Sequence, residues 1–233
     1  MKISTRQYLI FGAIIILTLV VTCGSYRLIQ QKWILFRKGE TLFLSRNPSE
    51  AIPYLSNAIR QGLEYPQAVL YLADAHMASR DFGRARLAYE TLVQQSPDHE
   101  MAWWRLSGLY EQDQAFRKAL DALDHLRKKR PDDPSVMLRT ARLHKYLKDY
   151  DSAIAHYRFF LNSVPSQTSV QLELAEVLAW SKHYPEAISR YQEFIDGNPE
   201  NRIARIYLAR VYFWNNQPEK AILEYRNALG DKP

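Results

Sequence analysis

The 233-residue sequence lacks the short motifs that usually mark an active site. It contains no H-E-x-x-H pair, no G-x-S-x-G turn and no glycine-rich loop that could hold a phosphate. Its six histidines show no paired spacing with cysteine that would suit a metal ion. We therefore expect the chain not to be an enzyme, with no catalytic residues, no metal site and no cofactor.

Cysteine is almost absent as well. The one cysteine, Cys23, lies in a run of uncharged residues, where a nucleophilic thiolate would be poorly solvated. The absence of any later cysteine suits an oxidising compartment, although cysteine-free domains also occur in reducing ones. Cysteine chemistry is thus disfavoured, and the compartment stays open.

The sequence also lacks a strong excess of one charge outside its N-terminal segment. The chain totals 31 Lys and Arg against 25 Asp and Glu, and without Lys2, Arg6 and Arg27 the balance is 28 to 25. A nucleic-acid-binding domain usually shows a larger positive excess, so we expect no nucleic-acid partner. The basic run at 127–130 ends an expected helix, where cations complement exposed carbonyls. Capping is the simpler interpretation, and a phosphate or anionic-lipid contact is the alternative.

A 34-residue spacing runs through the rest of the chain. Alanine recurs six times and proline five times at this interval, at Ala51, Ala85, Ala119, Ala153, Ala187 and Ala221, and at Pro97, Pro131, Pro165, Pro199 and Pro233. Each interval holds two apolar stripes of helical period; in residues 100–133 these are Trp103, Leu106, Ser107 and Tyr110, then Ala119, Leu123 and Leu126. A fixed period of this length predicts an array of helix-turn-helix units.

The residues of this period resemble the pattern of the tetratricopeptide repeat (TPR) family, W-x2-L-G-x2-Y followed by A-x3-F and P. The first unit is the weakest match, with Lys38 and Gly39 on its apolar stripe and Leu63 where later units have proline. The resemblance implies an all-α fold, a right-handed superhelical solenoid, and the uncharged run at 7–26 predicts one N-terminal transmembrane helix before it. About six helix-turn-helix repeats are expected, at residues 32–65, 66–99, 100–133, 134–167, 168–201 and 202–233.

Upstream of the repeats, Arg6 and Arg27 bracket twenty uncharged residues, QYLIFGAIIILTLVVTCGSY. A helix needs about 20 apolar residues to cross a hydrocarbon core of roughly 30 Å. We expect a basic flank at residues 1–7, a transmembrane anchor at 8–26 and a juxtamembrane helix at 27–31. A cleaved signal peptide and a lipoprotein signal ending at Cys23 remain alternatives.

The orientation of this anchor is nearly balanced by charge. The amino terminus, Lys2 and Arg6 oppose a second positive group formed by Arg27, Lys32, Arg37 and Lys38. A short basic N-terminus commonly stays in the cytoplasm, which favours a single-pass protein of a bacterial inner membrane with periplasmic repeats; cytoplasm-facing repeats are the alternative. Residues 26–45 contain no proline, so the membrane helix is expected to continue into the first repeat.

The resemblance also implies a binding surface on the first helix of each unit. TPR domains that clamp the C-terminal carboxylate of cytosolic chaperones use lysine at the fifth position and asparagine at the ninth, and no unit here has either. At the thirteenth position three aromatic residues stand 34 apart, which favours an amphipathic groove, although the rings could simply pack beside the turn. The expected groove contains Trp104, Arg105, Glu111, Arg142, Tyr146, Glu176, Trp180, Arg210 and Trp214.

The last expected helix presents a further apolar face. Ile222, Tyr225 and Leu229 follow the spacing that earlier units use for packing, and the sequence ends at Pro233 without another helix. Solenoid arrays need a polar capping face. We therefore expect this end to dock against a partner, a second copy of the chain, or additional sequence.

Two classes of function follow from these features. The first is a membrane-bound scaffold that binds peptide segments or membrane complex subunits. The phrases ELAEVLAWSKHYPEAISRY and YLARVYFWNNQPEKAILEY look like repeats of bacterial envelope scaffolds, including those of exopolysaccharide synthesis and secretion. The second is a carbohydrate-binding module that stacks sugars on the aromatic ladder, which the mostly ionic and aliphatic neighbours disfavour. A cytoplasm-facing quality-control adaptor differs from the first only in orientation.

Overall fold

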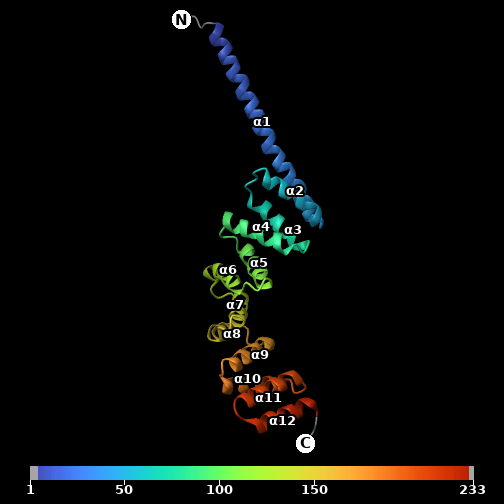
Figure 1. Ribbon diagram of the computed structural model, residues 1–233, viewed down its shortest axis with the longest axis vertical. Coiled ribbons are helices and arrows are strands. Elements are labelled where there is room, and N and C mark those ends of the chain that lie inside the picture. Colours follow the sequence, from blue (N-terminus) through green and yellow to red (C-terminus); the bar gives the residue numbers. More distant parts are fainter. Residues whose placement is uncertain (1–4, 231–233) are drawn as a thin grey trace. The chain divides into compact units, whose positions relative to one another are not determined.

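The structure, a computed structural model, describes residues 5–230 and shows helices and turns with no strand in that range (Figure 1). It divides into two compact units, Met1–Leu109 and Tyr110–Pro233. The helices are α1 (Thr5–Leu44), α2 (Pro48–Arg60), α3 (Pro66–Ala78), α4 (Phe82–Gln95), α5 (Glu100–Gln112), α6 (Phe116–Lys129), α7 (Pro134–Tyr146), α8 (Tyr150–Ser163), α9 (Thr168–Trp180), α10 (Tyr184–Gly197), α11 (Arg202–Trp214) and α12 (Pro218–Leu229).

Helix α1 is continuous over 40 residues, as the lack of proline between residues 26 and 45 predicts. Its C-terminal part packs against α2 as the first helix of the first repeat. The expected anchor at 8–26 forms the N-terminal part, where most side chains lie outside the described residues. Among the residues that are described, no helix combines the length and the mean hydropathy needed to cross a membrane.

The turn inside each repeat has the same backbone geometry. One residue per turn adopts a positive φ between 56° and 66°, and these residues recur every 34 positions: Arg46, Arg80, Gln114, Lys148, Lys182 and Asn216. At Lys148, the Asp149 N–H donates to the His144 carbonyl at 3.0 Å and the Lys148 N–H donates to the Lys145 carbonyl at 3.1 Å. This pair of hydrogen bonds forms a Schellman cap, which satisfies the last carbonyl groups of the repeat's first helix.

The prolines explain the turn between repeats. The residue before each of Pro97, Pro131, Pro165 and Pro199 leaves the helical region, with φ between −133° and −140° and ψ between 63° and 78°. Proline forces this change because its ring clashes with a preceding helical residue. The first repeat, which has Leu63 where later units have proline, ends α2 differently, since Gly62 takes a φ of 79°.

The six periodic alanines lie at the packed centre of the repeats, and all are buried. A small side chain lets two helices approach closely, and a large residue four positions later fills the neighbouring space. Tyr89, Tyr157 and Tyr191 occupy that later position and are also buried. Burial of all six alanines is what close helix packing at these positions requires.

The first repeat compensates for its weak sequence match through Gly39. A β-carbon at this residue would lie 2.7 Å from Leu55 Cγ and 3.2 Å from the Leu55 backbone nitrogen, so only glycine allows α1 and α2 to approach this closely. Lys38 stays exposed, and its Nζ lies 4.4 Å from the centre of the Tyr54 ring. Both unusual residues thus fit a TPR helix pair.

Candidate functional site

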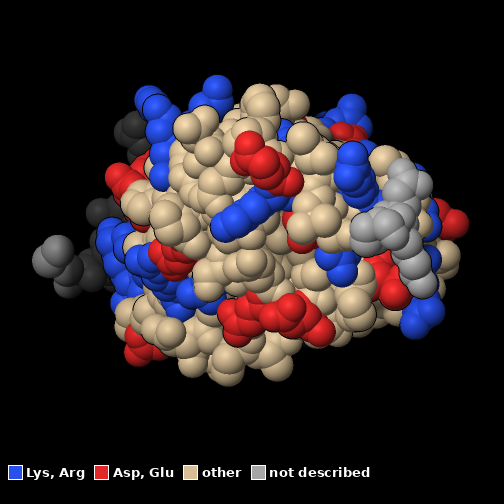
Figure 2. All heavy atoms as spheres, turned by 90° about the horizontal axis from the view of Figure 1, so that it is seen from below, with Lys and Arg blue, Asp and Glu red and all other residues tan. Residues whose placement is uncertain are grey.

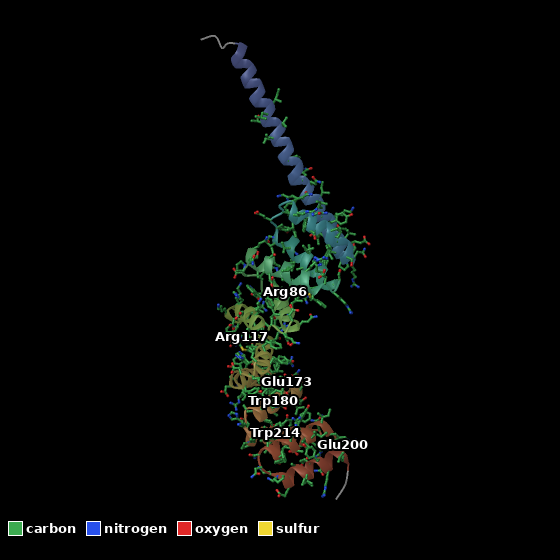
Figure 3. The ribbon with its side chains drawn as sticks, viewed as in Figure 1. Arg86, Arg117, Glu173, Trp180, Glu200 and Trp214 are labelled. Carbon is green, nitrogen blue, oxygen red and sulfur yellow. The ribbon has the colours of Figure 1, made fainter. Side chains whose placement is uncertain are left out.

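The three aromatic residues of the thirteenth position lie in the Tyr110–Pro233 unit. Tyr146, Trp180 and Trp214 are the last residues of α7, α9 and α11, and Figure 3 labels the two tryptophans. They are 53%, 39% and 39% exposed, although each belongs to a packed repeat. All three line one hollow of about 610 Å³, which we call the aromatic groove. The structure therefore brings together the rings that the 34-residue spacing singled out.

Residues from the turns complete the aromatic groove. Tyr150 and Tyr184 begin the second helices α8 and α10, and Lys148 and Lys182 are the positive-φ residues just before them. Further lining residues are Lys145, Glu176 and Ala179. Sequence reasoning left the lysines and these two tyrosines out of the expected groove, although both pairs keep the 34-residue spacing that would have revealed them.

Ring packing holds the groove in place without burying it. Tyr146 stacks on Phe116 with 5.0 Å between ring centres and an interplanar angle of 11°, and Trp180 lies 6.0 Å from Tyr150. The rings consequently pack beside the turns and still present surface to solvent. The two interpretations of these residues, packing and binding, are compatible.

The aromatic groove carries excess positive charge. Glu176 is paired with Lys145 at 3.4 Å, whereas Lys148 and Lys182 make no ion pair with any described residue. The acid next to Lys148, Asp149, is held elsewhere by the Ser152 N–H at 3.3 Å and by His144 at 2.9 Å. These hydrogen bonds, that from Ser152 foremost, lower the pKa of Asp149. Two lysine charges are thus left without a counterion.

Arg210 lies in an adjoining hollow, which shares Glu176, Trp180 and Trp214 with the aromatic groove. Its guanidinium carbon lies 5.0 Å from the centre of the Trp214 ring and 5.7 Å from that of Tyr207. At such distances the cation is attracted to the ring faces.

A third hollow, of about 330 Å³, continues from Glu176 and Tyr207 along α9 and α11. Its lining combines the apolar side chains of Leu172, Ile203 and Ala204 with Glu173 and with the polar residues Ser169 and Asn201. Ile203 is exposed. The three hollows share residues, so we treat them as one surface that is aromatic and basic at one end and mixed apolar and polar at the other.

Arg142, which the sequence placed in the groove, does not line the aromatic groove. Its guanidinium makes two hydrogen bonds to the carboxylate of Glu173, at 2.9 and 2.6 Å, and the Tyr157 hydroxyl donates to the same carboxylate at 2.8 Å. The hydrogen bond with Glu173 raises the pKa of Arg142. Burial would raise the pKa of Glu173, but hydrogen bonds from Arg142 and Tyr157 outweigh it and lower that pKa. Arg142 thus joins α7 to α9.

The remaining expected groove residues lie apart from the aromatic groove or in the other unit. Glu111 accepts a hydrogen bond from the Arg139 guanidinium at 3.0 Å. Trp104 and Arg105 belong to the Met1–Leu109 unit. There Arg105 is close enough to Tyr89 to oppose the rise in its pKa, which burial and a hydrogen bond to Asp74 produce.

The expected C-terminal docking face is exposed in the structure. Ile222, Tyr225 and Leu229 of α12 are 54%, 39% and 72% exposed. In earlier repeats the residue equivalent to Tyr225 is buried, as at Tyr157 and Tyr191. Pro233 lies outside the described residues, so the structure leaves the docking expectation as a prediction.

The charged side chains of the described residues are mixed in sign on the face that Figure 2 shows, with uncharged areas between them. Within residues 5–230, no group of three or more His, Cys, Asp or Glu residues is arranged to hold a metal ion. The buried His76 lies 3.6 Å from Asp81, and the partly buried His144 hydrogen-bonds Asp149. Each histidine thus contacts the residue that caps the N-terminus of the next helix.

Buried alanine crossings, repeated caps and a groove built from helix ends define the class: an all-helical repeat protein whose helix pairs present a shared surface. The chain belongs to the tetratricopeptide repeat family. The family model described as tetratricopeptide repeat matches residues 36–86, 72–134 and 181–233, together more than half of the chain.

Solved structures of TPR proteins share the fold at low sequence identity. YrrB, described as a TPR protein with an unusual peptide-binding site, is 15% identical with a TM-score of 0.63, over 77% of this chain and 92% of its own. A TPR protein from Parabacteroides merdae is 16% identical with a TM-score of 0.64, over 88% and 81%. MamA is 16% identical with a TM-score of 0.61, over 69% and 94%. No curated protein matches the chain in sequence.

Proposed function

We propose that this chain is a membrane-anchored TPR scaffold that binds polypeptide segments of partner proteins through the aromatic groove. The observation that carries the proposal is the set of five Tyr and Trp rings in one open hollow, three of them at least 39% exposed. Tyrosine and tryptophan dominate binding energy in protein interfaces because they bury large areas and keep a polar atom for hydrogen bonding. The peptide-binding site named for YrrB supports the same use of this fold.

The anchor proposal rests on α1. Four apolar side chains of its described N-terminal part, Ile16, Leu17, Val20 and Val21, are each more than 60% exposed. An apolar helix surface of this kind is stable in a lipid environment. We place residues 8–26 in a bacterial inner membrane, with the repeats in the periplasm. The proposed setting is an envelope assembly such as exopolysaccharide synthesis or secretion.

Fusion reporters test the orientation. Alkaline phosphatase joined after residue 233 should be active and a fluorescent protein dark if the repeats are periplasmic. The opposite pattern would contradict that orientation and favour a cytoplasm-facing adaptor. Mass spectrometry of the purified protein would show residues 1–22 retained, whereas loss of this segment would replace the anchor with a processed signal ending at Cys23.

The groove proposal is tested with the full chain in detergent micelles and a phage-displayed library of random 12-residue peptides. We expect the wild type to enrich a peptide family, and the triple variant Tyr146→Ala, Trp180→Ala, Trp214→Ala to lose binding to the corresponding synthetic peptides by at least about 100-fold, because several interface anchors are removed together. The helical circular-dichroism signal should be unchanged. Equal peptide binding by the triple variant, or no enrichment by the wild type, would overturn the proposal.

Carbohydrate binding is the second candidate, because Tyr146, Trp180 and Trp214 repeat at one interval along consecutive helices. The other groups that line the groove are mainly charged, three lysines and Glu176, beside the tyrosine hydroxyls. Charged lysines favour an anionic ligand over a neutral sugar. Titration with neutral oligosaccharides should therefore leave tryptophan fluorescence unchanged, and a saturable change would favour this candidate.

A further inference from the structure

We infer that the ligand of the aromatic groove is an acidic polypeptide segment, with carboxylates beside its aromatic contacts and an aliphatic side chain toward the far end. This inference rests on the proposed function, since it names the chemistry of the segment that the same site would take. It follows from three features: the unpaired lysines, the cations already on the ring faces, and the aliphatic hollow.

The first feature is the position of Lys148 and Lys182. Both line the aromatic groove and neither makes an ion pair with a described residue. Each is the positive-φ residue of a Schellman cap, at φ 60° and 66°, so the turn fixes its backbone. Lys145 neutralises Glu176 at 3.4 Å, and Asp149 is held by His144 and Ser152. The groove therefore offers two positive charges without counterions to a ligand.

The second feature excludes a cationic ligand. Groups of aromatic rings can bind ammonium groups through their faces. Here Lys145 Nζ already lies 5.8 Å from the centre of the Tyr146 ring and 6.0 Å from that of Trp180, and Arg210 lies 5.0 Å from that of Trp214. A second cation would be repelled by these charges and by the two free lysines. A carboxylate would instead be attracted.

The third feature favours a polypeptide over an anionic polysaccharide. The surface continues from the basic end, through Glu176 and Tyr207, into the hollow lined by Leu172 and Ile203. Glu173 also lines this hollow, but its carboxylate is engaged by Arg142 and by the Tyr157 hydroxyl. An aliphatic hollow gains free energy by burying apolar side chains, which a polypeptide carries and a uronic-acid chain lacks. One segment with acidic and apolar residues would therefore match both ends of the surface.

The test again uses phage selection on the full chain, followed by fluorescence polarisation with a synthetic enriched peptide. We expect enriched peptides to carry Asp or Glu next to Tyr, Trp or Phe, and a copy with every acid replaced by its amide to bind at least about tenfold more weakly. Affinity should fall as salt rises, because exposed charge pairs are screened. Enrichment of neutral or basic peptides would overturn the inference.

The protein variants are matched in charge. Lys148→Gln with Lys182→Gln should weaken peptide binding by about tenfold, since an exposed pair contributes up to about 1 kcal/mol. Glutamine is suitable because Gln114 adopts the same turn conformation, at φ 56°. The control, Lys128→Gln with Lys129→Gln, removes two exposed charges from α6 outside the groove and should leave affinity unchanged.

The outcomes separate this inference from the proposed function. If the Lys148 and Lys182 variant binds peptide as the wild type does while the triple aromatic variant does not, the acidic preference is wrong and peptide binding stands. If the triple aromatic variant also binds peptide normally, both the acidic preference and the proposed peptide binding by the groove are wrong. Lysine-dependent binding of polygalacturonate, without any peptide enrichment, would assign the groove to an anionic polysaccharide and overturn the inference.

Discussion

Each unit of the chain holds a cluster of aromatic rings, and the two clusters are arranged around different centres. In the Met1–Leu109 unit, Phe36 is 2% exposed and its ring centre lies 5.7 Å from that of Trp33, 5.2 Å from that of Tyr65 and 6.3 Å from that of Tyr71. In the Tyr110–Pro233 unit, the aromatic groove collects its rings at helix ends, where they stay partly exposed beside lysines. One repeat architecture thus places aromatic residues either for stability or for recognition.

The difference arises at the thirteenth position of the repeat. The first two repeats have Leu44 and Ala78 there, whereas the last three have Tyr146, Trp180 and Trp214. The buried alanine positions are the same in both units. The fold therefore depends on positions that both units share, and the surface chemistry depends on a position where they differ.

Alanine substitutions in the two aromatic clusters should differ most in their effect on the free energy of unfolding. Phe36→Ala should destabilise the first unit by about 3–5 kcal/mol, because a buried aromatic side chain leaves a cavity. Tyr146→Ala should destabilise the second unit by less than about 1 kcal/mol, because its ring is half exposed. Urea unfolding of the full chain in detergent measures both. Equal losses would mean that the groove rings are core residues.

Glycine-to-alanine substitutions test how closely the helices pack in the first helix pair and in the next pair of the same unit. Gly39→Ala should cost about 1–3 kcal/mol through overpacking against the fully buried Leu55. Gly83→Ala is the control, because a β-carbon there meets no atom within 4 Å, and it should stabilise α4 by about 0.5–1 kcal/mol. Thermal unfolding followed by circular dichroism gives both values. A neutral Gly39→Ala would contradict the close approach of α1 and α2.

The smallest expected effect is common to both units. Burial lowers the pKa of His76 in the first unit and, with His144 and Arg127 adding to it, the pKa of His156 in the second. The unfolded chain therefore binds protons at a higher pH than the folded chain does. Stability from these groups is complete above about pH 6.5 and is lost as the pH falls below it.

The denaturation midpoint should decrease as the pH is lowered from 7.5 to 5. His156→Gln should make the midpoint of the second unit depend less on pH, and the pH dependence of the first unit should stay unchanged. The matched variant His76→Gln should act only in the first unit. A midpoint that rises as the pH falls would show that the partners Asp81 and Asp149 dominate, in contradiction to the expected sign.

The residues that set the fold were predictable because each has one local consequence. Pro131 lacks a backbone hydrogen-bond donor and moves the backbone dihedrals of Arg130 out of the helical region. Ala119 has a small side chain that can be buried between closely packed helices. The three groove rings were predictable for the same reason, since a helix position and a fixed period place them together. Spacing alone could therefore give the repeats and the centre of the groove.

The partners of each polar residue could not be predicted in this way. Arg142 shares the ninth position with Glu176 and Arg210, but its guanidinium is engaged by Glu173 from the next repeat. Lys148 depends on a backbone conformation that usually requires glycine, so its place in the groove follows from the cap and not from the side-chain pattern. Such contacts depend on the conformations of long side chains that extend from one repeat to the next. The 34-residue period does not determine these conformations.

Because α1 is one continuous helix, it fixes the rotation of the first repeat about the helix axis relative to residues 8–26. Its residues 32–44 belong to the first helix pair and residues 8–26 to the proposed anchor, and no break in the helix separates them. Each residue of an α-helix turns the chain by about 100°, so one residue inserted between positions 26 and 32 would rotate the first repeat by about that angle relative to residues 8–26. Under the anchor proposal, the number of residues in this short stretch sets which side of the first repeat faces a protein held beside it at the membrane.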